Sequence, residues 1–212
     1  QNGKEEFYFG ETAKKISNFF EENGGLLSLE DLNQYKLRIL DPVCGTYRHY
    51  KVCSMAPPSS GGIALIQILN ILENIDLGKL DHNSEEYLKI LISAMDYAYK
   101  DRAEYLGDPD FYEVPQDLLT SKEYAKNIYQ LIQEKKVPSK INVNIAEGEE
   151  TTHFSVIDKW GNAVSNTYTL NTAYGSGIIP SGTGILMNNE MDDFSSKPGY
   201  PNAYGLIGSE AN

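Results

Sequence analysis

Residues 151–170, TTHFSVIDKWGNAVSNTYTL, contain two runs in which the residue types alternate along the chain. The first run covers residues 153–158 and the second covers residues 163–170. Residues 159–162 between them include Gly161 and Asn162, which are common in tight turns. A period of two places neighbouring side chains on opposite faces of a strand. The stretch therefore predicts a β-hairpin.

The composition changes where this hairpin begins. Residues 1–150 include 41 charged side chains, whereas residues 151–212 include 7, together with 8 glycines and 20 serine, threonine or asparagine residues. We therefore expect an α+β protein in which residues 1–150 are mostly helical and residues 151–212 are rich in strands and loops. Residues 135–150 lack any period and are rich in proline, asparagine and charge, which is typical of an exposed, flexible linker.

Periodicity and capping signals predict the elements of the first part. Helices are expected over residues 11–22, from the capping motif at 28–31, over 63–75, 84–106 and 121–134, and strands over 35–47 and 50–55. The helix over 63–75 is apolar on too many sides for a surface position, so we expect it to be buried on most sides. In the helix over 84–106 the apolar positions that keep helical spacing are Leu88, Leu91, Ile92, Met95 and Ala98 or Tyr99.

Charge and composition exclude several classes of protein. The 212 residues have a formal net charge of −12, which argues against binding to nucleic acid. Two cysteines and three scattered histidines do not form a clustered metal site, so no metal or cofactor is expected. The longest apolar stretch is interrupted by polar residues, so no membrane span is expected. The chain begins at Gln1 without an initiating methionine or signal pattern, and we interpret it as an internal segment of a longer protein.

Thr151 stands at the boundary between the two parts, directly after Glu149 and Glu150. If the chain were cut between Glu150 and Thr151, this threonine would carry a hydroxyl and a free α-amine. The amine has a pKa of roughly 7.7–8.0 and can accept the hydroxyl proton, so Thr151 would be both nucleophile and base. These residues alone fit the simpler interpretation that two β-branched residues begin a strand.

Three other motifs leave alternatives open. The acidic residues in 188–194 can bind the ammonium group of an amino-acid substrate or form a solvated or calcium-like acidic turn. The sequence PPSSGG at 57–62 fits an anion-binding helix start or a sharp structural loop. Cys44 and Cys53 lie near mirror positions of a hairpin, where a disulfide and two free thiols are both compatible with the sequence.

Several motifs together resemble one family. Residues 151–164, TTHFSVIDKWGNAV, residues 167–172, TYTLNT, and residues 184–194, GILMNNEMDDF, are similar to the small subunit of γ-glutamyltranspeptidase (glutathione hydrolase). Residues 54–62, SMAPPSSGG, and residues 98–109, AYKDRAEYLGDP, are similar to the C-terminal part of its large subunit. The resemblance covers nearly the whole chain in the order of the family.

The resemblance implies a fold and a domain organisation. The family has the four-layer αββα sandwich of N-terminal-nucleophile hydrolases, which is incomplete in this chain. Residues 1–150 would be the C-terminal part of the large subunit, and residues 151–212 would be the N-terminal part of the small subunit. The two subunits would form a heterodimer after the precursor cuts itself between Glu150 and Thr151.

The resemblance also implies a reaction and a site. Thr151 would transfer the γ-glutamyl group of glutathione or γ-glutamyl amides to water or an acceptor amino acid, and Thr169 would orient it. Asn171, Glu190 and Asp193 would bind the amino-acid end of the glutamyl group, beneath a lid at residues 198–209 that contains Tyr204. Missing arginine, serine and glycine motifs of the family imply that this segment alone is nearly inactive. Export to the periplasm or outside the cell also follows from the resemblance.

Other activities are compatible with the same scaffold. One is a cephalosporin acylase or a poly-γ-glutamate depolymerase. Another is an unprocessed, non-catalytic relative that only binds γ-glutamyl ligands. Asn171, Glu190 and Asp193 favour a substrate with a free glutamyl α-amine.

Overall fold

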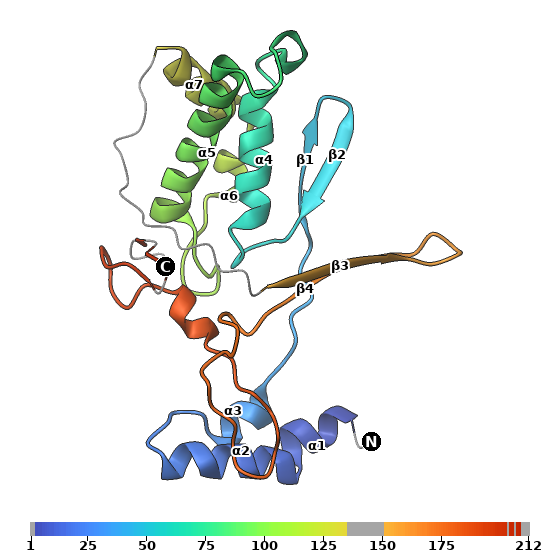
Figure 1. The fold of residues 1–212 in the computed structure, drawn as a ribbon, viewed down its shortest axis with the longest axis vertical. Helices are drawn as coiled ribbons and strands as arrows, with labels where there is room; N and C mark the ends of the chain where they lie inside the picture. The colour runs from blue at the N-terminus through green and yellow to red at the C-terminus, as the bar shows by residue number, and fades with distance from the viewer. Residues whose placement is uncertain (1–2, 135–150, 203, 206, 209–212) are drawn as a thin grey trace. The chain divides into compact units, whose positions relative to one another are not determined.

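The computed structural model describes residues 3–134, 151–202, 204–205 and 207–208 (Figure 1). The expected mixture of helices and strands is confirmed. Within the described residues the strands form two separate antiparallel hairpins, β1–β2 and β3–β4, whose completion into a four-layer sandwich stays a prediction. The elements are α1 (Gly3–Phe9), α2 (Glu11–Glu22), α3 (Leu29–Gln34), β1 (Val43–Tyr47), β2 (Tyr50–Ser54), α4 (Gly61–Leu72), η1 (Leu77–Lys79), α5 (Glu85–Tyr105), α6 (Gln116–Leu119), α7 (Lys122–Gln133), β3 (Thr152–Ile157), β4 (Ala163–Tyr168) and η2 (Glu190–Asp193).

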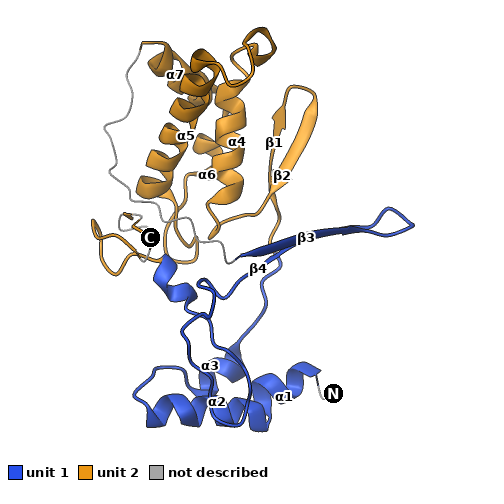
Figure 2. Ribbon diagram, viewed as in Figure 1, with its two compact units in different colours: residues 1–39, 146–193 blue, residues 40–145, 194–212 orange. Residues whose placement is uncertain are grey.

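The chain forms two compact units, each built from two separate stretches of sequence (Figure 2). One unit, the hairpin unit, comprises residues 1–39 and 146–193. The other, the helical unit, comprises residues 40–145 and 194–212. The hairpin unit therefore includes residues from both sides of the predicted processing site. The predicted division into two subunits between residues 150 and 151 refers to cleavage of the chain and stays a prediction.

The helical unit is held together by apolar packing of α4, α5 and α7. Ile71, Ala94 and Ile128 belong to one buried cluster of this unit, while Ile63 and Ile66 of α4 belong to a second cluster beneath β1. Helix α4 is buried on most sides, as expected. In its first turn Gly62 lies so close to the residue after β2 that a Cβ would overlap the Met55 carbonyl oxygen. The predicted cap at α5 is confirmed, since Ser84 accepts a backbone N–H of the first turn, and Ser121 caps α7 in the same way.

The predicted apolar face of α5 is its core face only in part, since Leu91 and Ala98 pack in the core. Its buried residues are Ile90, Ala94, Tyr97, Ala98 and Asp101, while Leu88, Ile92 and Met95 are exposed. Because α5 carries two apolar stripes, the periodicity alone does not indicate which one packs on α4 and α7. Asp101 decides it: its carboxylate accepts hydrogen bonds from Gln67 of α4 and from the Tyr124 hydroxyl of α7. Burial raises the pKa of Asp101, and the two hydrogen bonds lower it by less.

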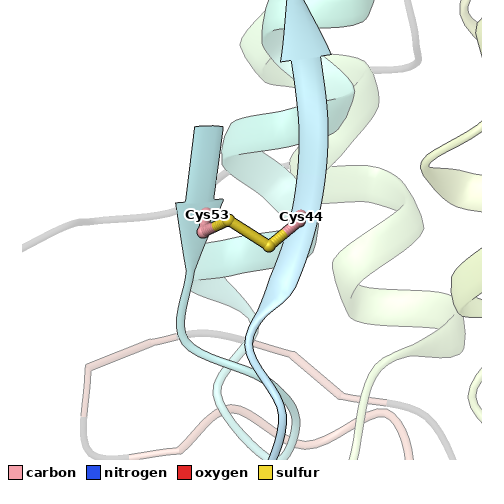
Figure 3. Close-up of a disulfide and its surroundings, with 2 residues drawn as sticks. All are labelled: Cys44 and Cys53. Carbon is pink, nitrogen blue, oxygen red and sulfur yellow. A yellow bond between two sulfur atoms is a disulfide. The ribbon is translucent and has the colours of Figure 1, made fainter. Parts of the chain in front are cut away.

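The β1–β2 hairpin is shorter than predicted and is closed by a disulfide. Residues 35–42 form no strand, and pairing begins at Val43 after Pro42, which has no N–H to donate. Cys44 lies directly opposite Cys53 and is bonded to it, with a Cα–Cα distance of 4.1 Å (Figure 3). This settles the alternative between a disulfide and free thiols. The turn of the hairpin is tied to the helices by Lys122, whose ammonium donates to the Thr46 carbonyl and to Glu73.

The hairpin unit combines three short helices with β3–β4 and the loop that follows it. Ala13 and Ile16 of α2 and Leu32 of α3 form its buried core. Helix α3 begins with the expected cap: Ser28 Oγ accepts the Asp31 N–H, and Asp31 accepts the Ser28 N–H. Every residue of β3 and β4 is exposed within the chain. The predicted hairpin is confirmed, with Thr152 opposite Tyr168 and Ile157 opposite Ala163.

Candidate functional site

Two threonines flank the open end of the β3–β4 hairpin. Thr151 directly precedes β3, and Thr169 directly follows β4. The last pair of the ladder is Thr152 with Tyr168, so Thr151 and Thr169 are the residues directly beyond this pair on the two chain segments. Thr151 is exposed, and Thr169 is half-buried. The two threonines are 18 positions apart in the sequence, and both lie at the open end of the hairpin.

The hydroxyl of Thr169 is oriented by the turn that follows it. Its Oγ1 accepts the backbone N–H of Asn171 at 2.9 Å. Because that contact occupies a lone pair of the oxygen, the hydroxyl hydrogen stays available for donation to a neighbouring group. Thr169 therefore has the polarity needed to donate a hydrogen bond towards Thr151.

The hairpin also carries a histidine that the sequence left unassigned. His153 Nδ1 is 2.7 Å from Thr167 Oγ1, and its Nε2 is 3.1 Å from Ser165 Oγ. These bonds join β3 to β4 two residues away from Thr151. His153 therefore links the two strands of the hairpin that the two threonines flank.

Asn171 is buried, with 6% of its surface exposed, in a left-handed backbone conformation at φ 77°. Asparagine is one of the few residues that tolerate this conformation. Its side-chain Nδ2 donates to the Asn189 carbonyl at 2.9 Å. The turn after β4 is thereby attached to residues 187–189, and Gly175 allows this approach because a Cβ there would overlap the Met187 carbonyl oxygen.

Glu190 and Asp193 lie in the short 3₁₀-helix η2, directly after Asn189. Glu190 is half-buried, and its Oε1 is buried without a hydrogen-bond partner among the described residues. Burial raises the pKa of Glu190, and the negative charge of Asp193 raises it further. A bound ammonium group would satisfy the unpartnered oxygen and relieve the repulsion between the two carboxylates.

The loop that carries these groups rests on α2 and α3. Ile185 and Met187 pack against the buried cluster that includes Ile16 and Leu32. Lys15 of α2 donates from Nζ to the Gly182 carbonyl at 3.3 Å. The sequence did not predict this packing of residues 182–187 on α2, because the two segments are more than 150 positions apart and no local pattern in one indicates the other.

For two of the predicted residues, Tyr204 and Glu150, the proposed roles stay predictions. Tyr204 lies in the helical unit, in a loop where its backbone N–H is bonded to Asn202 Oδ1 and where Gly199 N–H is bonded to the Gly208 carbonyl. Its place in the site stays a prediction. Glu150 lies outside the described residues.

Among the described residues, no group of three or more histidine, cysteine, aspartate or glutamate side chains is arranged to hold a metal ion. None of the described helices is both long enough and apolar enough to cross a bilayer.

Comparison with solved structures defines the class of fold. The structure of cephalosporin acylase from Bacillus halodurans superposes with a TM-score of 0.76 over 97% of this chain and 37% of that one, at 28% sequence identity. The γ-glutamyltranspeptidase of Helicobacter pylori matches 62% of this chain and 38% of that chain, with a TM-score of 0.60 and 47% identity. The fold is that of the N-terminal-nucleophile hydrolases.

Sequence comparison then narrows the class to one family. The model of the family described as γ-glutamyltranspeptidase matches residues 1–212. The glutathione hydrolase proenzyme of Escherichia coli (strain K12) is 51% identical over all of this chain. The chain therefore belongs to the γ-glutamyltranspeptidase family. It spans 37% of the length of the E. coli relative.

Proposed function

We propose that the protein transfers γ-glutamyl groups, from glutathione and other γ-glutamyl compounds, through an acyl-enzyme on Thr151. The observation that carries this proposal is the register of β3–β4, in which Thr151 and Thr169 directly flank the last pair of the ladder, Thr152 with Tyr168. The Asn171 turn follows on the same strand, and its link to η2 connects the nucleophile to a carboxylate site.

The nucleophile is released by the protein itself. Thr151 Oγ bonds to the carbonyl carbon of Glu150, and the C–N bond to Thr151 breaks as its nitrogen takes a proton. Water then hydrolyses the ester, which leaves a Glu150 carboxylate, a free Thr151 hydroxyl and a free α-amine. Residues before and after the cut remain associated as large and small subunits. Packing of Ile185 and Met187 on α2 and α3 supports this association.

Turnover uses the new amine as the base. The Thr151 α-amine takes the hydroxyl proton while Oγ bonds to the γ-carbonyl carbon of the donor, and the amine of the leaving group departs with a proton. Thr169 donates a hydrogen bond that orients Thr151 Oγ. Water or an acceptor amino acid then attacks the ester and restores the Thr151 hydroxyl.

Specificity for the glutamyl group comes from its zwitterionic end. Glu190 and Asp193 bind the ammonium group, and the unpartnered Glu190 oxygen supports this role. Asn171 contributes an amide at the same end, and Tyr204 covers the bound group as part of the lid. We further propose a periplasmic or secreted protein. The Cys44–Cys53 disulfide supports an oxidising compartment.

The decisive experiment compares two neighbouring threonines in the protein expressed at its full encoded length. Thr151→Ala is expected to remain one chain on a denaturing gel. Thr152→Ala, whose side chain lies on the other face of the hairpin, is expected to yield two chains, the smaller beginning with threonine. Cleavage of Thr151→Ala at this bond, or full γ-glutamyl-p-nitroanilide hydrolysis by an uncut wild type, would refute the proposal.

A second enzymatic function deserves the same assay. The match to a cephalosporin acylase structure favours an acylase as the alternative, and a poly-γ-glutamate depolymerase is the other activity expected on this scaffold. A free α-amine on the substrate distinguishes the γ-glutamyl reaction from these alternatives, since Glu190 and Asp193 are proposed to bind the ammonium group. Hydrolysis of γ-glutamyl-p-nitroanilide and not of its N-acetylated form supports the γ-glutamyl reaction. A wild type that stays intact on long incubation would instead be a non-catalytic binding relative.

A further inference from the structure

Asn189 connects the two halves of the candidate site through both its main chain and its side chain. Its N–H donates to the Leu170 carbonyl at 3.1 Å, and its carbonyl accepts from Asn171 Nδ2 at 2.9 Å. Its side-chain Oδ1 accepts the Thr172 N–H at 3.2 Å, and its Nδ2 donates to Asp192 Oδ2 at 2.9 Å. A single residue therefore contacts the turn after β4 and the 3₁₀-helix η2.

The contacts of the side chain divide cleanly between these two segments. The oxygen binds the Asn171 side of the site through Thr172, whose hydroxyl also lies 3.3 Å from it. The nitrogen binds the Glu190 side through Asp192, one residue before Asp193. Because Asn189 is half-buried, water cannot fully replace these bonds when the side chain is removed.

We propose that Asn189 is a positioning residue that sets the separation between Asn171 and the Glu190–Asp193 carboxylates, an inference that rests on the proposed function. Its hydrogen bonds go to Leu170, Asn171, Thr172 and Asp192. Its role is to hold the groups that grip the amino-acid end of the donor at the spacing of one ammonium and one carboxylate. Its loss weakens donor binding and leaves the chemical step on Thr151 largely unchanged.

The test uses the fully processed, full-length enzyme and γ-glutamyl-p-nitroanilide as donor. Asn189→Ala is expected to raise KM about tenfold, the usual scale for a lost half-buried hydrogen-bond pair, with kcat changed less than about threefold. The inhibition constant of L-glutamate is expected to rise by the same factor, which measures binding without turnover. Asn74→Ala is the matched control, because Asn74 also donates from Nδ2 to backbone carbonyls, at the end of α4.

Asn189→Asp keeps the oxygen that Thr172 contacts, loses the donor to Asp192 and adds a negative charge beside the Asp192 carboxylate. This variant is expected to raise KM and to fold and be processed like the wild type. It therefore tests the inference even if the alanine variant does not fold. The effects of Asn189→Ala and Thr172→Val on KM are expected to be non-additive in the double variant. Both substitutions remove the contact between Asn189 Oδ1 and the Thr172 hydroxyl.

The outcomes separate this inference from the function on which it rests. A fall in melting temperature with unchanged KM and glutamate inhibition, or a loss of kcat alone, overturns the positioning role of Asn189 and leaves the proposed function intact. A processed wild type without γ-glutamyl hydrolysis overturns the proposed function and this inference with it.

Discussion

The helical unit and the hairpin unit are stabilised by different kinds of contact. In the helical unit, α4 alone buries Ile63, Ile66 and Ile71, and the unit is held by apolar packing with one buried carboxylate. In the hairpin unit no residue of β3 or β4 is buried within the chain. The loop with the candidate site is held by hydrogen bonds through Asn171 and Asn189 and by one small apolar seat on α2 and α3.

The difference separates what stabilises the protein from what shapes the site. Apolar packing is strong and non-directional, so it sets the stability of the helices. Hydrogen bonds are weaker but directional, so they fix the positions of a few polar groups. We therefore expect substitutions in the two units to change different measured quantities.

The largest effect is expected from matched isoleucine substitutions. Ile16 and Ile71 are both 0% exposed, Ile16 in the seat of the site loop and Ile71 in the helical core. Each Ile→Ala change is expected to lower the free energy of unfolding by about 2–5 kcal/mol, because it leaves a cavity. Only Ile16→Ala is expected also to raise KM for the γ-glutamyl donor. Denaturant unfolding and steady-state kinetics measure both effects, and an equal change of KM in the two variants would contradict the distinction.

A smaller effect is expected at the buried carboxylate of the helical unit. Since burial raises the pKa of Asp101 above its unfolded value, its contribution to stability is fully present below the unfolded pKa and is lost as pH rises through the folded pKa. Asp101→Asn keeps an oxygen for Gln67 and Tyr124 and removes the charge. It is expected to gain stability relative to the wild type as pH rises from about 4 to 8.

Melting temperatures of both proteins across that range provide the measurement. Asp101→Leu is the matched control, because it also removes the charge but leaves the Tyr124 hydroxyl without its acceptor. It is expected to be less stable than Asp101→Asn at every pH. A difference between wild type and Asp101→Asn that does not vary with pH would show that the charge of Asp101 is not destabilising.

The smallest effect is expected at the ion pair that holds the β1–β2 turn. Lys122 lowers the pKa of Glu73, so the pair stabilises the fold above the unfolded pKa of Glu73, and this contribution is lost as pH falls through the folded pKa. Lys122→Met is expected to cost at most about 0.5–1 kcal/mol at neutral pH, because the pair is partly exposed. The loss should be smaller in high salt and should decrease as pH falls through the folded pKa of Glu73, leaving the part due to the Thr46 contact. Lys126→Met, on the exposed surface of the same helix, should cost less under all conditions.

Local signals in the sequence predicted most elements of the fold. The capping serines at 28 and 84 and the alternation over residues 151–170 predicted helices and a hairpin that the structure confirms. The predicted strand over residues 35–47 was too long, because Pro42 interrupts it. The predicted apolar face of α5 was buried only in part, because periodicity detects an apolar stripe but not its partner.

The sequence alone indicated the candidate reactive residues. The threonine behind an acidic linker and the carboxylates in a short acidic turn follow from their own residue types, and the asparagine after the second strand follows from the resemblance to a family. Residue types and local motifs are properties of neighbours along the chain, so they can be interpreted without a fold. Only the tertiary structure decided that Thr151 and Thr169 flank the same end of one hairpin, that Cys44 is bonded to Cys53, that Asn189 links Asn171 to η2, and that α2 supports this loop. These contacts join residues 9 to 167 positions apart, and their partners are chosen by strand register and by packing, which no local pattern specifies.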